Sequence, residues 1–124
     1  MAFHNELGRE GEKIAIKYLK SRGYIIYHTN WRMSNLEVDI IAENADELVF
    51  IEVKTRSSDK YGEPQEAVGI QKERDLLTIA GVYLENLEME VSSRFDIIAI
   101  ILNEHKSYIT HFEDVFSSMT IGMS

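Results

Sequence analysis

The chain has 124 residues, 44% of them hydrophobic, with one proline and no cysteine. We expect a single domain over residues 1–124, with a core of about 5–112 and a tail of about 113–124, because this length buries one sizeable core but not two. The lack of cysteine excludes disulfides, thiolate metal sites and cysteine nucleophiles. The polar N-terminus, and the lack of an apolar run of about 20 residues, predict a cytoplasmic protein with no membrane partner.

The formal net charge of −8 argues against a surface that binds nucleic acid through general positive charge. A polyanionic partner would have to be met by a local group of cations. The candidates for such a group are Arg32, Lys54, Arg56, Lys60, Lys72 and Arg74. Taken singly, each of them is explained better as ordinary solvated surface.

The first predicted element is an amphipathic helix from about Asn5 to Arg22, which Gly23 ends as a C-terminal cap. Its apolar residues recur at spacings of three, four and seven. Glu12 lies at the border of this apolar stripe, where an ordinary flanking glutamate is the simplest interpretation. Gly8 and Gly11 remove bulk from nearby turns and are expected to allow a close approach of the helix to the sheet.

Strands follow the helix. Residues 24–30 form the first strand and residues 31–36 a turn or a ragged strand end. Residues 38–56 then form a hairpin about residues 44–47. A loop over 57–63 leads to a second helix, from near Pro64 to about Met89, and strands follow at 94–102 and 107–112. This order predicts an α/β fold with a mixed central sheet flanked by helices on both faces.

The hairpin carries charges that interrupt its apolar pattern. If its loop has two or four residues, positions that sum to 91 lie opposite one another, so that Asp39 faces Glu52 and Glu37 faces Lys54. A three-residue loop would shift this register by one. Alternation then predicts two faces. The core face carries Val38, Ile40, Ala42, Val49, Ile51 and Val53, and the other face carries Ile41, Leu48, Phe50 and the four charged residues.

Asp39 and Glu52 form the proposed centre of a site. Like charges in opposed positions destabilise a sheet, and Cβ atoms about 5 Å apart let both carboxylates reach one cation. Oxygen ligands of this kind suit Mg²⁺ or Mn²⁺. The Lys54 ammonium can hold an attacking water or offset charge on a phosphate. The alternatives left open are a wet hairpin face and, for Lys54, a salt bridge to Glu37.

Several stretches together carry a resemblance to a known family. In order and spacing, GREGEKIAIKYLKSRGY, NWR, EVDII, FIEVKTR, YGEPQEAV, Lys72 and RFDIIAI resemble the YraN-like family of bacterial proteins, which are predicted endonucleases of the restriction-endonuclease-like fold. The resemblance covers roughly residues 5–101. Two departures leave the ligands in place: Leu36 stands where many relatives have glycine, and no proline precedes Asp39.

The resemblance implies a PD-(D/E)xK nuclease core. In it, Asp39 and Glu52 would bind Mg²⁺, with the Val53 carbonyl as a further ligand, and Lys54 would be the catalytic lysine. Glu12 matches the helix glutamate that archaeal Holliday junction resolvases of this fold place beside the metal. Further positions that match the family's series are Arg32, Glu37, Arg56, Lys72, Arg94 and Asp96.

The expected activity is metal-dependent hydrolysis of DNA, on branched or single-stranded substrates in repair or recombination. Arg32, Arg56 and Lys72 are candidate nucleic-acid contacts, while Arg94 and Asp96 are equally well explained as a structural pair. The alternative function is a nuclease-fold module that binds nucleic acid or protein without cutting. A homodimer that cuts both strands, as in the resolvases, also stays open.

Overall fold

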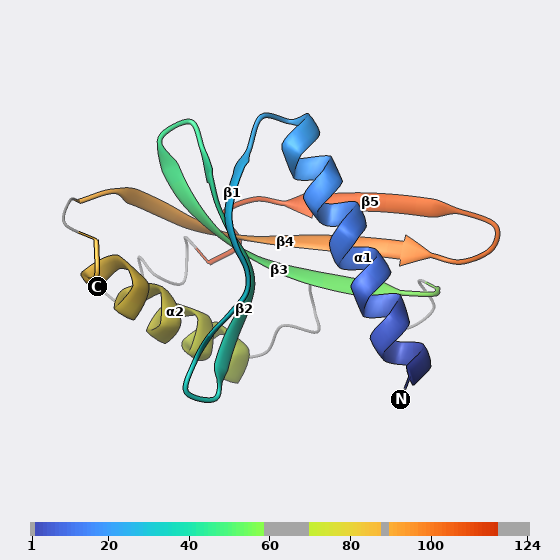
Figure 1. Ribbon diagram of the computed structural model, residues 1–124, viewed down its shortest axis with the longest axis horizontal. Coiled ribbons are helices and arrows are strands. Elements are labelled where there is room, and N and C mark those ends of the chain that lie inside the picture. Colours follow the sequence, from blue (N-terminus) through green and yellow to red (C-terminus); the bar gives the residue numbers. More distant parts are fainter. Residues whose placement is uncertain (1, 59–69, 88–89, 117–124) are drawn as a thin grey trace.

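The computed structural model describes residues 2–58, 70–87 and 90–116 (Figure 1). Its elements are α1 (Ala2–Ser21), β1 (Ile25–Met33), β2 (Leu36–Asn44), β3 (Glu47–Arg56), α2 (Ile70–Glu85), β4 (Ser92–Leu102) and β5 (Ser107–Phe112). The strands form one sheet in the order β1-β2-β3-β4-β5. The β3 and β4 strands pair in parallel and the other neighbours pair antiparallel, so the predicted mixed sheet is confirmed.

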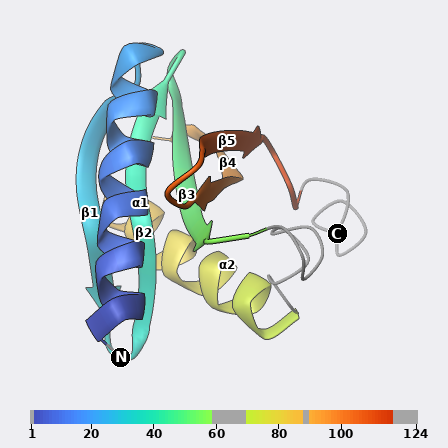
Figure 2. The same cartoon turned by 90° about the vertical axis from the view of Figure 1, so that its right-hand side faces the viewer.

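The two helices cover opposite faces of the sheet. In Figure 2 they are seen apart, with β3 between them. The core of the α1 face consists of Ala15, Leu19, Tyr24, Ile40, Ala42, Val49, Ile51, Ile98 and Ile100. The core of the α2 face consists of Val38, Ile41, Leu48, Phe50, Leu76, Ile79, Ala80 and Phe116. Neighbouring strand residues alternate between these two cores, as the pleat of a strand requires, and the predicted α/β fold with helices on both faces is thereby confirmed.

The end of α1 follows the predicted pattern. Gly23 adopts a φ of 88°, a left-handed conformation that favours glycine. The backbone N–H of Tyr24 donates to the carbonyl of Leu19 at 3.0 Å, which closes the last turn. Residues 31–33 continue β1, which agrees with the strand end that was one of the two predicted alternatives, and β2 already begins at Leu36. Trp31 is partly buried against the α2-face core, and this packing extends the strand.

The β2–β3 hairpin has a two-residue loop, one of the two loop lengths on which the predicted register depends. Ala45 and Asp46 adopt φ values of 52° and 65°, the pair of left-handed conformations found in a type I′ turn. The pairs from Asn44↔Glu47 to Ile40↔Ile51 all follow the predicted register. This register fixes which side chains of the hairpin reach the site.

The predicted assignment of side chains to the two faces of the hairpin is wrong at Val38. This residue packs in the α2-face core with Ile41, whereas Ile40 packs on the α1 face as predicted. The β2–β3 pairing ends at Ile40↔Ile51, and beyond it the Asp39 carboxylate accepts the Val53 N–H at 2.8 Å. A side chain therefore takes the place of a backbone partner, and the alternation of β2 is broken at this point.

Two predicted boundaries lie outside the described residues, namely the loop over 57–63 beyond residue 58 and the start of the second helix near Pro64. The second helix ends at Glu85, before the predicted end at about Met89. At the other end, Phe116 is buried and the Val115 N–H donates to the Phe95 carbonyl at 2.8 Å, so packed structure continues past residue 112. In the described part, no helix combines the length and the apolar character needed to cross a bilayer.

Candidate active site

A pocket of about 800 Å³ opens between the N-terminal half of α1 and the ends of β1, β2 and β3. In Figure 1 the N-terminal end of α1 lies near the carboxyl end of β3, on the same side of the sheet. The pocket is lined by Leu7, Gly8, Arg9, Glu12, Lys13, Ile16, Asn30, Arg32, Glu37, Asp39, Val53, Lys54 and Thr55. The fold thus brings Glu12 of α1 into the same pocket as Asp39 and Lys54 of the hairpin, a placement that only the family resemblance had implied.

Asp39 lies where β2 and β3 separate. The predicted direct opposition to Glu52 is wrong in detail, because the ladder stops one pair short and the Asp39 carboxylate accepts the Val53 N–H instead. The two carboxylates still act on each other, since the charge of Asp39 helps to raise the pKa of Glu52. Burial raises the pKa of Asp39 above its ordinary value, and the Val53 hydrogen bond and nearby lysines oppose this shift.

Glu52 lies beneath two lysines and is 5% exposed. Its Oε2 atom is 3.5 Å from Nζ of Lys54 and 3.4 Å from Nζ of Lys72. Its Oε1 atom is buried and has no hydrogen-bond partner among the described residues. Burial, followed by the charge of Asp39, raises the pKa of Glu52 to about 7 despite both lysines.

The Lys54 salt bridge to Glu37, which the sequence left open, is replaced by the bridge to Glu52. Glu37 instead accepts from Nε of Arg32 at 3.3 Å. Lys72 donates from Nζ to the Glu37 carbonyl at 3.5 Å as well as contacting Glu52. Lys72 is therefore held within the acidic group.

Glu12 reaches the pocket because α1 packs tightly on β3. A Cβ atom added at Gly11 would lie 1.8 Å from Oγ1 of Thr55, so this close approach requires glycine. Gly8 is different, since an added Cβ would meet nothing within 4 Å, and the prediction of a close approach there is wrong. Nδ2 of Asn30 donates to Oε1 of Glu12 at 2.7 Å.

The electrostatics of Glu12 tie it to the other carboxylates. Burial raises its pKa, and the Asn30 hydrogen bond opposes that shift. The negative charges of Asp39 and Glu37 raise it further. The carboxylates of Glu12 on α1 and of Glu37 and Asp39 on β2 therefore influence one another electrostatically.

The structure separates the predicted nucleic-acid contacts from one another. Arg32 lines the pocket, and its side chain is 72% exposed. Arg56, the last residue of β3, is not among the lining residues. Three further residues line the pocket, although the sequence did not mark them as site residues: Arg9, Lys13 and Asn30. Arg9 and Lys13 have a signal in the sequence, because they are four residues apart on the same helix and flank Glu12.

The residues present fit a divalent metal ion. The buried Oε1 atom of Glu52 has no partner in the described part, and Asp39 supplies a second acceptor nearby. Among the described residues, no group of three or more His, Cys, Asp or Glu side chains forms a ready-made cage. An ion held by Asp39 and Glu52 alone would have to keep several waters, which is the habit of Mg²⁺.

A second charged group lies on the α1 face and is structural. Asp96 is fully buried, and Arg94 donates to it from Nε at 3.0 Å and from a terminal nitrogen at 3.2 Å. Nε2 of His111 lies 2.6 Å from Asp96, and Nδ1 of His111 lies 3.0 Å from the Tyr18 hydroxyl. Burial alone would raise the pKa of Asp96, but these hydrogen bonds outweigh it and lower the pKa. The structural pair that the sequence offered for Arg94 and Asp96 is present.

Comparison with known proteins now identifies the family. The model of the "Uncharacterised protein family UPF0102" matches residues 11–100. The chain belongs to the UPF0102 family. This confirms the family prediction, because YraN-like proteins are UPF0102 proteins. The matched range contains every predicted catalytic residue: Glu12, Asp39, Glu52 and Lys54.

Relatives of this UPF0102 chain match nearly their whole length. The UPF0102 protein of Bacteroides thetaiotaomicron is 42% identical over 116 residues, which cover 94% of this chain and 96% of the relative. That of Christiangramia forsetii is 44% identical, with 94% and 98% covered. The UPF0102 protein of Thermodesulfovibrio yellowstonii is 46% identical over 111 residues, with 90% and 96% covered. The aligned regions thus take in most of this chain and nearly all of each relative.

Proposed function

We propose that this UPF0102 chain is a Mg²⁺- or Mn²⁺-dependent endonuclease with a restriction-endonuclease-like, PD-(D/E)xK core. The observation that carries the proposal is the Glu52 carboxylate. Its Oε2 atom contacts two lysines, while its buried Oε1 atom has no partner among the described residues. An unpaired buried carboxylate oxygen is costly, and a cation shared with Asp39 would remove that cost.

Asp39 and Glu52 would hold the metal, together with the Val53 carbonyl. The Val53 N–H already fixes the Asp39 carboxylate, so this ligand is oriented before any ion arrives. When bound, the ion neutralises phosphate charge and lowers the pKa of its water. Glu12 lies within the electrostatic reach of Asp39 and would orient solvent at the edge of the same group.

Lys54 acts on the reacting groups. Its ammonium lines the pocket 3.5 Å from Glu52 and is positioned to hold the attacking water or to stabilise the charge that develops on the phosphate. In-line attack then breaks the bond to the 3′ oxygen. Lys72 contacts Glu52 from α2 and offsets the negative charge of the carboxylates before substrate binds.

The substrate we propose is DNA, branched or single-stranded, in repair or recombination, and a homodimer would allow both strands to be cut. A second function has one observation in its favour. Lys54 and Lys72 partly neutralise Glu52 without any metal, as expected of a module that binds nucleic acid or protein without cutting. The orphaned Oε1 atom favours the enzyme, because a purely structural ion pair gains nothing from it.

The test combines metal binding with cleavage. Calorimetric titration with Mg²⁺ and Mn²⁺ is made on the wild type, on Asp39→Asn and on Asp46→Asn, a matched control in the exposed hairpin turn. The same proteins are then incubated with labelled branched, single-stranded and duplex DNA. We expect Asp39→Asn to lose both metal binding and cleavage, and Asp46→Asn to keep both. A wild type that binds no ion at millimolar concentration and cuts no DNA would replace this proposal with the binding module.

A further inference from the structure

The pocket that holds the carboxylates also gathers positive charge. Its lining includes four cationic side chains, those of Arg9, Lys13, Arg32 and Lys54, against the three carboxylates of Glu12, Glu37 and Asp39. The whole chain, by contrast, has a formal net charge of −8. A polyanion repelled by most of this surface would therefore meet a favourable local field here.

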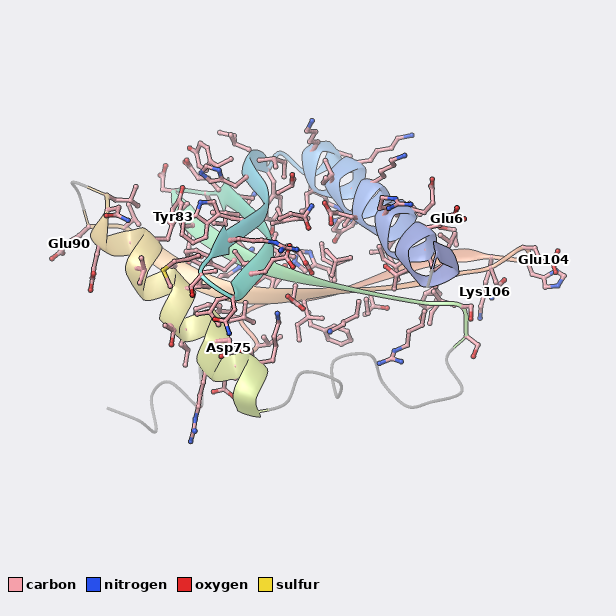
Figure 3. All side chains as sticks on the ribbon, turned by 60° about the horizontal axis from the view of Figure 1, so that its bottom comes forward. Glu6, Asp75, Tyr83, Glu90, Glu104 and Lys106 are labelled. Atoms are coloured by element: carbon pink, nitrogen blue, oxygen red, sulfur yellow. The ribbon has the colours of Figure 1, made fainter. Side chains whose placement is uncertain are left out.

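A second pocket provides the contrast. It has a volume of about 560 Å³, and its lining contains Glu43, Asp46 and Glu90 but no lysine, arginine or histidine. Tyr83 and Glu90 belong to this pocket, and Figure 3 shows them at the opposite end of the molecule from Glu6, near the start of α1. The negative charge of this second pocket would repel a phosphate chain. The pocket beside α1 is therefore the one whose charge favours binding of a polyanion.

Helix α1 supplies two of the cations on one wall. Arg9 and Lys13 are four residues apart, so they project from the same side of the helix, and both are exposed. Arg9 has no ion-pair partner in the part of the chain that the structure describes. Lys13 is 3.8 Å from Glu10, but both side chains are largely exposed, and such a pair contributes little. Both cations are therefore available to a ligand.

The β1 strand supplies the other wall. The Arg32 side chain is 72% exposed and forms an ion pair with Glu37, which also lines the pocket. The carboxylates of Glu12 and Asp39 line the same pocket as this arginine and the cations of α1. A DNA backbone that crosses the pocket from α1 to β1 would therefore meet cationic side chains on both walls.

We propose that the DNA backbone crosses this pocket between α1 and β1, with phosphates contacting Arg9 and Lys13 on one side of the scissile bond and Arg32 on the other. This inference rests on the proposed function and specifies its substrate path. The proposed contacts differ from the nucleic-acid contacts predicted from the sequence, which were Arg32, Arg56 and Lys72. Arg56 lies outside the pocket, and Lys72 contacts Glu52.

The experiment measures how DNA affinity depends on salt. Each phosphate contact contributes about −0.9 to the slope of log K against log salt for duplex DNA and about −0.7 for single strands. Losing two contacts should therefore make the slope shallower by about 1.8 or 1.4. All proteins carry Asp39→Asn, so that no strand is cut, and binding of labelled duplex, single-stranded and four-way-junction DNA is followed by fluorescence anisotropy.

The test variant combines Arg9→Ala with Lys13→Ala, and the control combines Lys17→Ala with Lys20→Ala. Lys17 and Lys20 are exposed on the same helix but do not line the pocket, so both proteins lose the same net charge. We expect the test variant to bind DNA about tenfold or more weakly, with the shallower slope, and the control to match the parent. Unchanged melting temperatures will establish that both fold.

The possible outcomes distinguish an error in the proposed DNA path from an error in the proposed function. If the test variant keeps the parental affinity and slope, the path is wrong even where the wild type cuts DNA. If the control variant loses as much as the test variant, net charge and not the pocket governs binding, and the path is again wrong. If the parent binds none of the three DNAs and the wild type cuts none, the proposed function and the path fail together.

Discussion

Asn30 on β1 donates a hydrogen bond of 2.7 Å to Glu12 on α1 and so joins the two walls of the candidate site. Asn30 adopts a φ of 51°, a left-handed conformation that asparagine tolerates better than most residues. The backbone strain and the hydrogen bond occur in the same residue. We interpret Asn30 as a positioning residue that holds the Glu12 carboxylate and opposes the rise in its pKa caused by burial.

The first prediction concerns Asn30→Asp. The substitution keeps the size of the side chain but replaces a donor with a second negative charge, so the pKa of Glu12 should rise further. NMR titration of the side-chain carboxyls measures this shift without reference to activity. Asn30→Gly removes the hydrogen bond and leaves the backbone conformation unstrained, so it should raise the same pKa by a smaller amount. A Glu12 pKa that stays the same in both variants would show that Asn30 does not control this group.

The second prediction concerns Lys54→Ala. Lys54 contacts Glu52 and lines the pocket, whereas the Val53 N–H holds Asp39 without its help. We expect the variant to keep Mg²⁺ binding and to lose turnover by about 10²-fold or more, as for other groups that stabilise transition-state charge. Single-turnover cleavage at saturating enzyme measures the chemical step. Wild-type turnover in this variant would remove Lys54 from the mechanism.

The third prediction compares two glycines of α1. Gly11→Ala would place a Cβ 1.8 Å from Oγ1 of Thr55 and push the helix off β3, at a cost of about 1–3 kcal/mol in unfolding free energy. Gly8→Ala meets open space and should stabilise the helix by up to about 1 kcal/mol. Urea denaturation of both variants measures whether each substitution lowers or raises the free energy of unfolding. Equal effects would mean that α1 does not depend on close contact at Gly11.

The sequence predicts the hairpin register because apolar alternation and a two-residue turn both specify it. It fails at Val38, because the break in β2 depends on the Asp39 carboxylate competing for the Val53 N–H, a contact that no local pattern encodes. Glu12 is predicted through the family resemblance alone, because its place on the helix favours an ordinary flanking glutamate. Asn30 is not, because its role depends on how closely α1 approaches the sheet at Gly11.

The last prediction concerns the stability of the metal-free protein as a function of pH. Burial and the Asp39 charge raise the pKa of Glu52 from an ordinary value of 4.5 to about 7 in the folded protein. Between these two values the folded state binds more protons than the unfolded state, so the free energy of unfolding should fall as pH rises. The full effect is on the order of 3 kcal/mol, present below about pH 4.5 and lost by about pH 7.

Urea denaturation at pH 5, 6, 7 and 8 in the presence of a chelator measures this slope. Glu52→Gln, which cannot ionise, should flatten the dependence of the unfolding free energy on pH between pH 5 and 7. Lys72→Met removes a cation that lowers the Glu52 pKa, so in this variant the unfolding free energy should continue to fall above pH 7. Saturating Mg²⁺ should restore stability at pH 7, because an ion bound to the folded state stabilises it by mass action. A wild-type profile as flat as that of Glu52→Gln would mean that Glu52 is ionised throughout, held by Lys54 and Lys72 alone.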